Sequence, residues 1–489
     1  MAAGLAGVWM VVRHLSWVVP LALGAVLLSL GIGEPWTGSY DANGARYSLA
    51  ARNTLRYGLW ATRGGQVVNG GVVARERFRV YAHHPPGISL AIAGSFAVFG
   101  ESEWSARVVF VAFTLGAAGC LVAVGRVLGG PWLGGLAALV LVVQPMVAFY
   151  GRMPDHEAPG AFFALLIVAL YLRWWRGGRV GWLAGASVAA FVGMGFAWAV
   201  FPVPWLVVAW DWAERRRASR GGLVVVGAAI AGFVAVLAHS AMLSGGVGEL
   251  WQALAHRAGS AAGDRGEAAR FAVSAFAGRQ CAYFAIAFTL LALPLCGIGL
   301  VAARRTQRPA VLLTAALAVF GLFNVLAFKQ GAYVHIYYQF YLAVALALGT
   351  GLGLEHLRRR LRRGASALVV GSLVVLLGVE GAGKLARIRS ERTPDYELQC
   401  EVAPALRRLT GPAERVLVQW DRASMFRQLT YYADRDVTVV REPGVAQEMI
   451  EKGGFDAVFR VAEPVAGTAV LRRWSGGGDG RAPGRPPGR

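Results

Sequence analysis

The chain alternates between long uncharged apolar runs and short polar segments. A helix of roughly 17–25 apolar residues crosses a bilayer, and ten uncharged runs are of about that length or longer. They cover residues 15–33, 108–125, 131–150, 158–175, 180–210, 221–243, 281–303, 309–328, 338–355 and 365–381. This pattern predicts an all-α polytopic membrane protein.

Arginines gather in the short loops between these runs, and the positive-inside rule places such loops in the cytoplasm. The clusters are Arg173, Arg176 and Arg179; Arg215, Arg216, Arg217 and Arg220; Arg304, Arg305 and Arg308; and Arg358, Arg359, Arg360, Arg362 and Arg363. The run 180–210 has a cluster at each end, and as one helix it would be about 46 Å long, so we expect it to cross twice. The parity gives eleven spans, with the amino end in the cytoplasm and the carboxy end outside.

One apolar stretch, residues 86–100, is too short for a span. If it crossed the membrane, the loop at 151–157 would fall in the cytoplasm and the basic cluster at 173–179 outside, which reverses the order that the positive-inside rule predicts. We therefore expect a re-entrant or interface-lying helix that begins at Pro86 and ends at Gly100.

Three polar segments then lie outside the membrane. Residues 34–107 form a first outer loop with helices of its own, and 244–280 form a second. Both belong to a transmembrane region that covers residues 1–383. Residues 384–474 follow it as a small extracytoplasmic α/β domain.

The carboxy-terminal domain is predicted from three β-rich stretches between helical ones. Strands are expected at residues 415–420, 437–440 and 456–461, where β-branched and aromatic residues predominate. The last residues, 475–489, are rich in Gly, Pro and Arg and are expected to be a disordered tail.

Composition agrees with a membrane location. Only 16% of the residues are charged, against about a quarter in soluble domains. The net charge of +21 lies mostly in the short loops, and no basic and aromatic pattern in a polar domain points to nucleic acid. The four cysteines show no CxxC spacing, which disfavours a disulfide framework or a structural zinc site. The stretch from Leu15 to Gly33 is longer than the apolar core of a signal peptide, so a retained first span is expected.

Asp41 opens the first candidate site. It begins a helical segment that Gly58 is expected to stop. The residue is either the N-cap of that helix or a base held just outside the membrane. The two roles are compatible, because a cap fixes the position of its carboxylate.

Two further polar groups lie in the outer segments. His83 and His84 precede two prolines, and adjacent histidines can bind a metal or a phosphate. Asp155 and Glu157 stand at the start of an apolar run, where they either satisfy the helix dipole or hold a divalent cation. The residues alone leave both alternatives open.

A late outer turn, residues 329–338, carries a lysine where the positive-inside trend predicts none. Its tyrosines are ordinary for a membrane interface. Lys329 and Arg152 are the basic residues of the short outer turns. A lysine in this position indicates an anionic partner, for which a phosphate is the natural candidate.

These motifs form an ordered series that resembles a known superfamily. The series comprises Asp41, Ala45-Arg46-Tyr47, Tyr57-Gly58-Leu59-Trp60, the stretch from His84 to Gly100, Glu103-Trp104-Ser105-Ala106-Arg107, Glu157-Ala158-Pro159 and Lys329 through Tyr338. It is similar to the C-type membrane glycosyltransferases, which include protein O-mannosyltransferases and the lipid A aminoarabinose transferase. The resemblance covers roughly residues 15–355.

The resemblance implies roles for the acidic residues. Asp41 would take the proton of the acceptor. Glu157, with Asp155, would orient the acceptor or hold a divalent cation, and no other cofactor is implied. Ala42 follows Asp41 where protein mannosyltransferases usually have a second acid.

The resemblance also implies a lipid donor. His84, Lys329, His335 and Tyr337 would contact the phosphate of a polyprenyl-phosphate sugar whose tail stays among membrane lipids. His84 stands where relatives often carry lysine.

The function implied is an inverting glycosyltransferase on the outer face of a bacterial cytoplasmic membrane. Its acceptor would be a lipid, a glycan or a protein of the cell envelope, and nucleic acid is not expected as a partner. The alternative is a flippase or transporter of lipid-linked sugars. Transporters place ionisable residues near the bilayer midplane, whereas the acidic residues here lie at one outer face.

Overall fold

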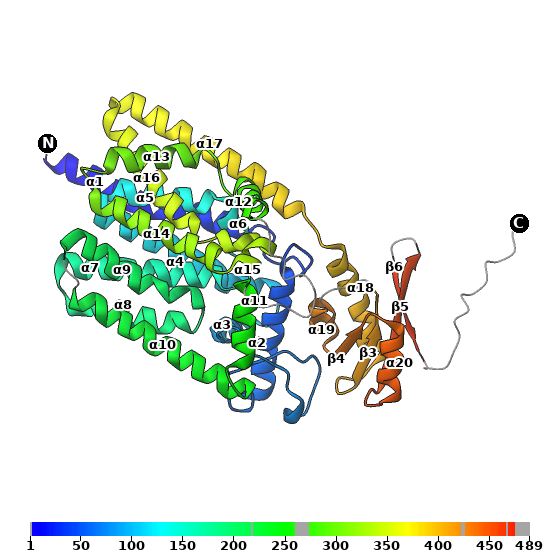
Figure 1. The fold of residues 1–489 in the computed structure, drawn as a ribbon. Coiled ribbons are helices and arrows are strands. Elements are labelled where there is room, and N and C mark those ends of the chain that lie inside the picture. Colours follow the sequence, from blue (N-terminus) through cyan, green and yellow to red (C-terminus); the bar gives the residue numbers. More distant parts are fainter. Residues whose placement is uncertain (1, 217–218, 260–272, 422–425, 466–467, 475–489) are drawn as a thin grey trace, which may run out of the picture.

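Each apolar run forms one or more helices, and these lie side by side at one end of the molecule (Figure 1). The computed structural model describes residues 2–216, 219–259, 273–421, 426–465 and 468–474. The expected disordered tail, 475–489, lies outside the described residues. The bundle contains α1 (Ala2–Ser29), α4 (Glu103–Gly129), α5 (Pro131–Val143), α6 (Pro145–Tyr150), α7 (Glu157–Gly177), α8 (Val180–Met194), α9 (Pro202–Arg215), α10 (Arg220–Ser244), α13 (Ala292–Ala303), α14 (Arg308–Ala327), α16 (Leu342–Arg360) and α17 (Arg363–Ser390).

The bundle is that of a multi-pass membrane protein. Among the described residues, α4, α7, α10, α14 and α17 are long and apolar enough to cross a membrane, and a bent pair of helices brings the number to six. Other apolar helices, among them α5 and α8, are shorter. The mostly helical fold agrees with the sequence-based expectation.

The run 180–210 does not form one long helix. It forms α8 and α9, joined by a turn that contains the 3-10 helix η2 (Trp198–Val200). Pro202 is the first residue of α9, a position where its missing N–H costs nothing. The predicted division of this run into two helices is confirmed.

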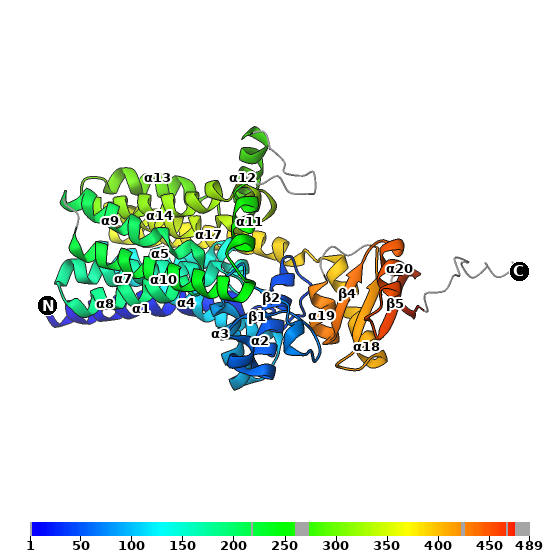
Figure 2. The ribbon, with the colours of Figure 1, turned by 60° about the horizontal axis from the view of Figure 1, so that its bottom comes forward.

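The outer elements pack against one end of the bundle (Figure 2). They are α2 (Asp41–Thr62), β1 (Gln66–Val67), η1 (Arg75–Arg77), β2 (Val80–Tyr81), α3 (Gly87–Phe99), α11 (Gly248–Arg257), α12 (Val273–Ala287), α15 (Lys329–Val334) and η3 (Ile336–Gln339). Helix α3 lies between Pro86 and Gly100, as predicted. It packs against both α2 and α4, so it connects the helix of the first outer loop to the bundle.

Residues 394–473, the carboxy-terminal unit, contain a four-stranded sheet of order β4-β3-β5-β6. Strand β3 is parallel to β4 and β5, and β6 is antiparallel to β5. The elements are α18 (Pro394–Leu409), β3 (Arg415–Gln419), α19 (Arg427–Ala433), β4 (Asp436–Val440), α20 (Pro443–Glu451), β5 (Ala457–Val465) and β6 (Thr468–Arg473). The three predicted strands correspond to β3, β4 and β5, while β6 was not predicted.

The run 281–303 departs from the expected straight helix. It bends by 97° between α12 and α13, and polar side chains satisfy the exposed backbone groups. The Glu380 carboxylate on α17 accepts the N–H of Leu290 at 2.7 Å, and Lys384 donates to the carbonyl of Phe288 at 2.6 Å. Gln144 accepts the N–H of Thr289 at 2.9 Å. The sequence analysis missed this bend because its polar partners lie on other helices.

We expect Glu380→Leu to destabilise the bend. The substitution leaves two backbone N–H groups and the Lys384 ammonium without their acceptor, and each such loss costs about 1–3 kcal/mol. Thermal unfolding of the purified protein in lipid nanodiscs should show a lower melting temperature. Val379→Leu, at an exposed neighbouring position, is the control, and an equal effect of both variants would contradict the role given to Glu380.

Candidate active site

A buried apolar cluster fixes the outer helix α2 against α3 and α4. Trp36, Tyr47 and Ile92 are fully buried within it. Gly58 has φ 81° and interrupts α2, as expected, although one more turn continues to Thr62. The amino-terminal half of α2 is thereby held over the end of the bundle.

Asn43 on α2 contacts the acidic turn that precedes α7. Its Nδ2 donates to Oδ2 of Asp155 at 2.5 Å, and Oδ1 of Asp155 accepts the N–H of His156 at 2.9 Å. Both oxygens of this carboxylate therefore have donors. Asp155 is buried, and the pair joins the outer loop to the bundle.

His156 has a defined tautomer. Its Nδ1 lies 2.9 Å from the carbonyl oxygen of Phe196, which can only accept, so Nδ1 carries the proton. Its Nε2 then accepts the Tyr47 hydroxyl at 2.8 Å.

The ring of His84 stacks on that of His156, with centroids 4.0 Å apart. Burial and the neighbouring His156 lower the pKa of His84 well below its usual value, and burial also lowers the pKa of His156. Both rings are neutral at pH 7.

Glu157 is the first residue of α7 and is buried. Its Oε2 has no hydrogen-bond partner among the described residues. Nowhere among the residues that the structure describes are three His, Cys, Asp or Glu side chains arranged to hold a metal ion. The geometry thus offers two neighbouring carboxyl groups, at Asp155 and Glu157, and no complete metal site.

Three arginines surround this turn. Arg46 lies over the Tyr81 ring, 4.0 Å from its centroid. Arg257 on α11 donates to the Tyr338 hydroxyl at 3.0 Å. Arg427 on α19 donates to Oδ1 of Asn43 at 2.8 Å. Guanidinium groups remain charged at any physiological pH, so the cluster carries positive charge that its histidines do not supply.

Aromatic rings line the same region. His335 and Tyr337 stack with centroids 5.0 Å apart, and Tyr40 meets Tyr337 edge-on at 5.1 Å. Burial, and then the charge of Arg257, lower the pKa of His335 to about 4. His335 is therefore neutral as well.

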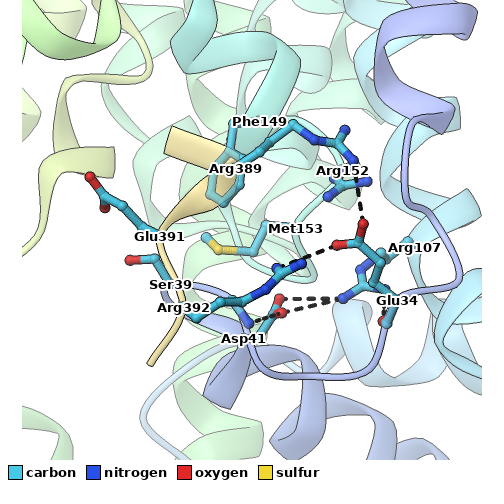
Figure 3. A pocket seen from close by; sticks show the side chains of 11 residues that line it. Glu34, Ser39, Asp41, Arg107, Phe149, Arg152, Met153, Arg389, Glu391 and Arg392 are labelled. Carbon is cyan, nitrogen blue, oxygen red and sulfur yellow. Dashed lines mark hydrogen bonds and ion pairs between the residues drawn. The ribbon is translucent and has the colours of Figure 1, made fainter. Parts of the chain in front are cut away.

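Asp41 occupies a separate pocket (Figure 3). It is the first residue of α2, and Tyr40 with φ 66° is the N-cap, so the predicted capping role of Asp41 is wrong. Its Oδ2 accepts the N–H of Gly38 at 2.8 Å, and both oxygens lie 3.4 Å from Arg107. Burial raises the pKa of the Asp41 carboxyl, although Arg107 and the Gly38 N–H oppose that shift.

This pocket is small and largely internally paired. Its volume is about 20 Å³, which is room for about one water. Arg389 and Arg392 both pair with Glu34, at 3.6 and 3.5 Å. Arg152 donates to the carbonyl of Leu30. The dashed lines in Figure 3 trace the ion pairs between the side chains.

The structure brings most of the predicted site residues together. His84, Asp155, Glu157, His335 and Tyr337 belong to the cluster around the acidic turn. Asp41 lies in the separate pocket, and Lys329 is exposed at the start of α15.

Sequence reasoning did not identify three members of the cluster. They are Asn43, Arg257 and Arg427. Arg257 had one available signal, because it is a basic residue in a predicted outer segment.

Comparisons with known proteins bear on the fold and on the family resemblance. Residues 83–239 match the family model described as dolichyl-phosphate-mannose-protein mannosyltransferase. The match includes His84, Asp155 and Glu157. No curated protein matches the chain.

Solved structures share the fold. The crystal structure of ArnT from Cupriavidus metallidurans bound to undecaprenyl phosphate has a TM-score of 0.61, at 15% identity over 94% of both chains. The oligosaccharyltransferase AglB from Archaeoglobus fulgidus, in complex with an inhibitory peptide and a dolichol-phosphate, has a TM-score of 0.59, at 12% identity over 92% of this chain and 69% of that one. The mycobacterial arabinofuranosyltransferase AftD has a TM-score of 0.53, at 14% identity over 91% of this chain and 35% of its own. The resemblance to the C-type membrane glycosyltransferases is confirmed.

The buried neutral histidines predict a loss of stability in mild acid. A histidine whose pKa is lowered by folding stabilises the protein above its unfolded pKa, near 6.5, and this contribution is lost as the pH falls below that value. The melting temperature should drop between pH 7.5 and 5.5, and it should drop less in His84→Gln. His256→Gln, on the exposed surface of α11, is the control. An unchanged pH dependence in His84→Gln would contradict this account.

Proposed function

We propose that this protein transfers a sugar from a polyprenyl-phosphate donor to a hydroxyl group of a cell-envelope acceptor, with inversion at the anomeric carbon. The reaction takes place where the apolar bundle meets the outer loops. This function rests above all on one observation. The buried carboxylate of Asp155 accepts from Asn43, whose amide oxygen in turn accepts from the guanidinium groups of Arg46 and Arg427, at the polar end of a membrane bundle.

The comparisons support a lipid phosphate as an anion bound on one side of this cluster. ArnT was solved with undecaprenyl phosphate and AglB with a dolichol-phosphate. Both structures have the same fold as this chain, and the matched family is named for a dolichyl-phosphate sugar. With the eleven spans and the cytoplasmic amino end that the sequence predicts, the site would lie outside. The carboxy-terminal ends of α7 and α9, which carry Arg176 and Arg215, lie at the opposite end of the bundle from the sheet (Figure 2).

Arg257 and Tyr338 are the best placed groups for the donor phosphate. The Tyr338 hydroxyl accepts from Arg257, and η3 packs against α12 and α14 of the apolar part. A lipid tail that stays in the bilayer brings its phosphate to this side of the site. The guanidinium group stabilises the negative charge that builds up on the leaving phosphate.

Asp155 is the best placed base. The acceptor oxygen attacks the anomeric carbon, the bond from that carbon to the phosphate oxygen breaks, and polyprenyl phosphate leaves with the bonding electrons. The acceptor proton passes to the Asp155 carboxylate. Asn43 and the N–H of His156 hold this carboxylate in position.

Asp41 acts in this scheme as a positioning residue. Its carboxylate ties Gly38 and Arg107 together at the start of α2, two residues before the catalytic face of the helix begins with Asn43. The sequence alone assigned the base to Asp41, so the two carboxylates make distinct predictions.

Asp155→Asn should reduce sugar transfer by about 10²–10⁴-fold, the usual contribution of a general base. Asp41→Asn keeps an acceptor for the Gly38 N–H and should reduce transfer by about tenfold or less, as expected for one charge-assisted hydrogen bond. The measurement is the release of polyprenyl phosphate by the purified protein from a labelled polyprenyl-phosphate sugar, with an envelope extract as acceptor.

Glu448→Gln, an exposed position in α20, is the matched control and should be fully active. A larger loss of transfer in Asp41→Asn than in Asp155→Asn would identify Asp41 as the base instead. If the protein in vesicles moves the intact labelled donor from one leaflet of the membrane to the other and releases no polyprenyl phosphate, the result would instead support a flippase.

Arg257→Gln should weaken donor binding. The substitution removes the positive charge next to Tyr338, and we expect the KM for the lipid donor to rise by about tenfold or more, since a charged hydrogen bond contributes about 1.5–3 kcal/mol. Steady-state kinetics with the labelled donor test this expectation. Arg279→Gln, on the exposed surface of α12, is the control, and an unchanged KM in Arg257→Gln would exclude this donor site.

A further inference from the structure

The carboxy-terminal unit is fixed to the first outer loop by partly buried polar contacts. Asp434, at the end of α19, pairs with Arg56 at 2.6 Å and with Arg52 at 3.2 Å. Burial opposes the charge of Asp434, but these arginines prevail and lower its pKa. The Tyr432 hydroxyl donates to Glu103 at 2.6 Å and accepts the N–H of Trp36 at 2.9 Å.

The two backbones also approach closely at this junction. A Cβ on Gly70 would lie 2.2 Å from the carbonyl oxygen of Arg435, and one on Gly71 would lie 2.4 Å from that of Pro412. Both contacts require glycine. Helix α19 therefore has a set position relative to α2, and so do the side chains that it presents.

One of these side chains, Arg427, enters the candidate active site. The Nη1 atom of Arg427 donates to Oδ1 of Asn43 at 2.8 Å, and the Nη2 atom of Arg46 donates to the same oxygen at 3.3 Å. Within the described part of the chain, neither guanidinium forms an ion pair. The Nε of Arg46 is buried and has no hydrogen-bond partner among the described residues.

This arrangement is electrostatically incomplete. Burial and the charge of Arg46 lower the pKa of Arg427 to about 10. Tyr47, Tyr81 and Asp155 raise the pKa of Arg46 despite its burial, so the charge that lacks compensation is that of Arg427, which Arg46 repels. Buried charges are normally paired. The nearby carboxylate of Asp155 already accepts from Asn43 and His156. An anion between Arg46 and Arg427 would relieve this repulsion.

We propose that Arg46 and Arg427 form a second anion site, which binds a phosphate or carboxylate on the water-facing part of the substrates. It rests on the proposed function and adds to it that the acceptor or the transferred sugar is anionic. The donor phosphate is an unsuitable occupant, because its lipid tail holds it on the side of Arg257 and the bundle. Arg427 belongs to a helix on the far side of α2 from that bundle (Figures 1 and 2).

The test is anion-dependent stabilisation of the full-length protein in nanodiscs. The probes are inorganic phosphate, glucuronate and, as the uncharged control, glucose. Phosphate, glucuronate or both should raise the melting temperature by a few degrees in a saturable manner, whereas glucose should not. Arg427→Gln and Arg46→Gln should lose the shift, and Arg408→Gln, exposed on α18, should keep it.

The probe that stabilises identifies the source of the anion. A shift with glucuronate supports an acidic sugar, and a shift with phosphate alone supports a phosphorylated acceptor. A shift that Arg257→Gln abolishes and Arg427→Gln retains would place phosphate at the donor site and overturn the second site. So would the absence of any shift.

Two features keep the test decisive. If Arg427→Gln does not fold, Arg427→Lys retains the charge but loses the planar fork, and it should bind the same probe more weakly. Equal binding by that variant would overturn the role of the fork. The assay does not depend on catalysis. If the unsubstituted protein binds the anion but transfers no sugar, the result counts against the proposed function and not against the anion site.

Discussion

The hydrogen bond between Asn43 and Asp155 is the interaction on which the outer half of the structure depends. Asn43 lies on the outer helix, Asp155 on the bundle, and Arg427 of the carboxy-terminal unit reaches the same amide from the other side. A neutral amide can donate to the carboxylate and accept from guanidinium groups at once. No charged side chain could satisfy both neighbours, so this one residue joins three parts of the chain.

The bundle imposes a second constraint on the site. A lipid donor requires an entrance at the level of the membrane surface, and irregular backbone at that level is tolerated only when its polar groups are satisfied. The bend between α12 and α13 meets this condition through Glu380, Lys384 and Gln144. The bent segment packs against α15 and η3, which carry the aromatic side of the site. Polar groups within the bundle thus shape the outer site without entering it.

The sequence predicted the parts of the fold that follow from local pattern. Apolar runs, the helix from Pro86 to Gly100 and three strands were all found, because hydrophobic period and flanking residues determine them. It also singled out Asp155, Glu157, His84, His335 and Tyr337, which the structure brings into one cluster; their roles stay predictions. Asn43 and Arg427 were missed because they are 384 positions apart and meet only through the docking of α19. The assignment to Asp41 followed from its place in the motif. Asn43, two residues further along α2, is the residue that contacts the acidic turn, and side chains two positions apart point to different sides of a helix.

The choice of basic side chains follows from burial. Imidazoles in this site are driven to the neutral form, as the lowered pKa values of His84, His156 and His335 show. They can orient and accept protons, but they cannot counter a phosphate. Arginine keeps its charge under the same burial, so the positive charge of this site comes from its guanidinium groups. Arg257 comes from the membrane side and Arg427 from the carboxy-terminal unit, and a substrate bound between them must therefore bridge the two.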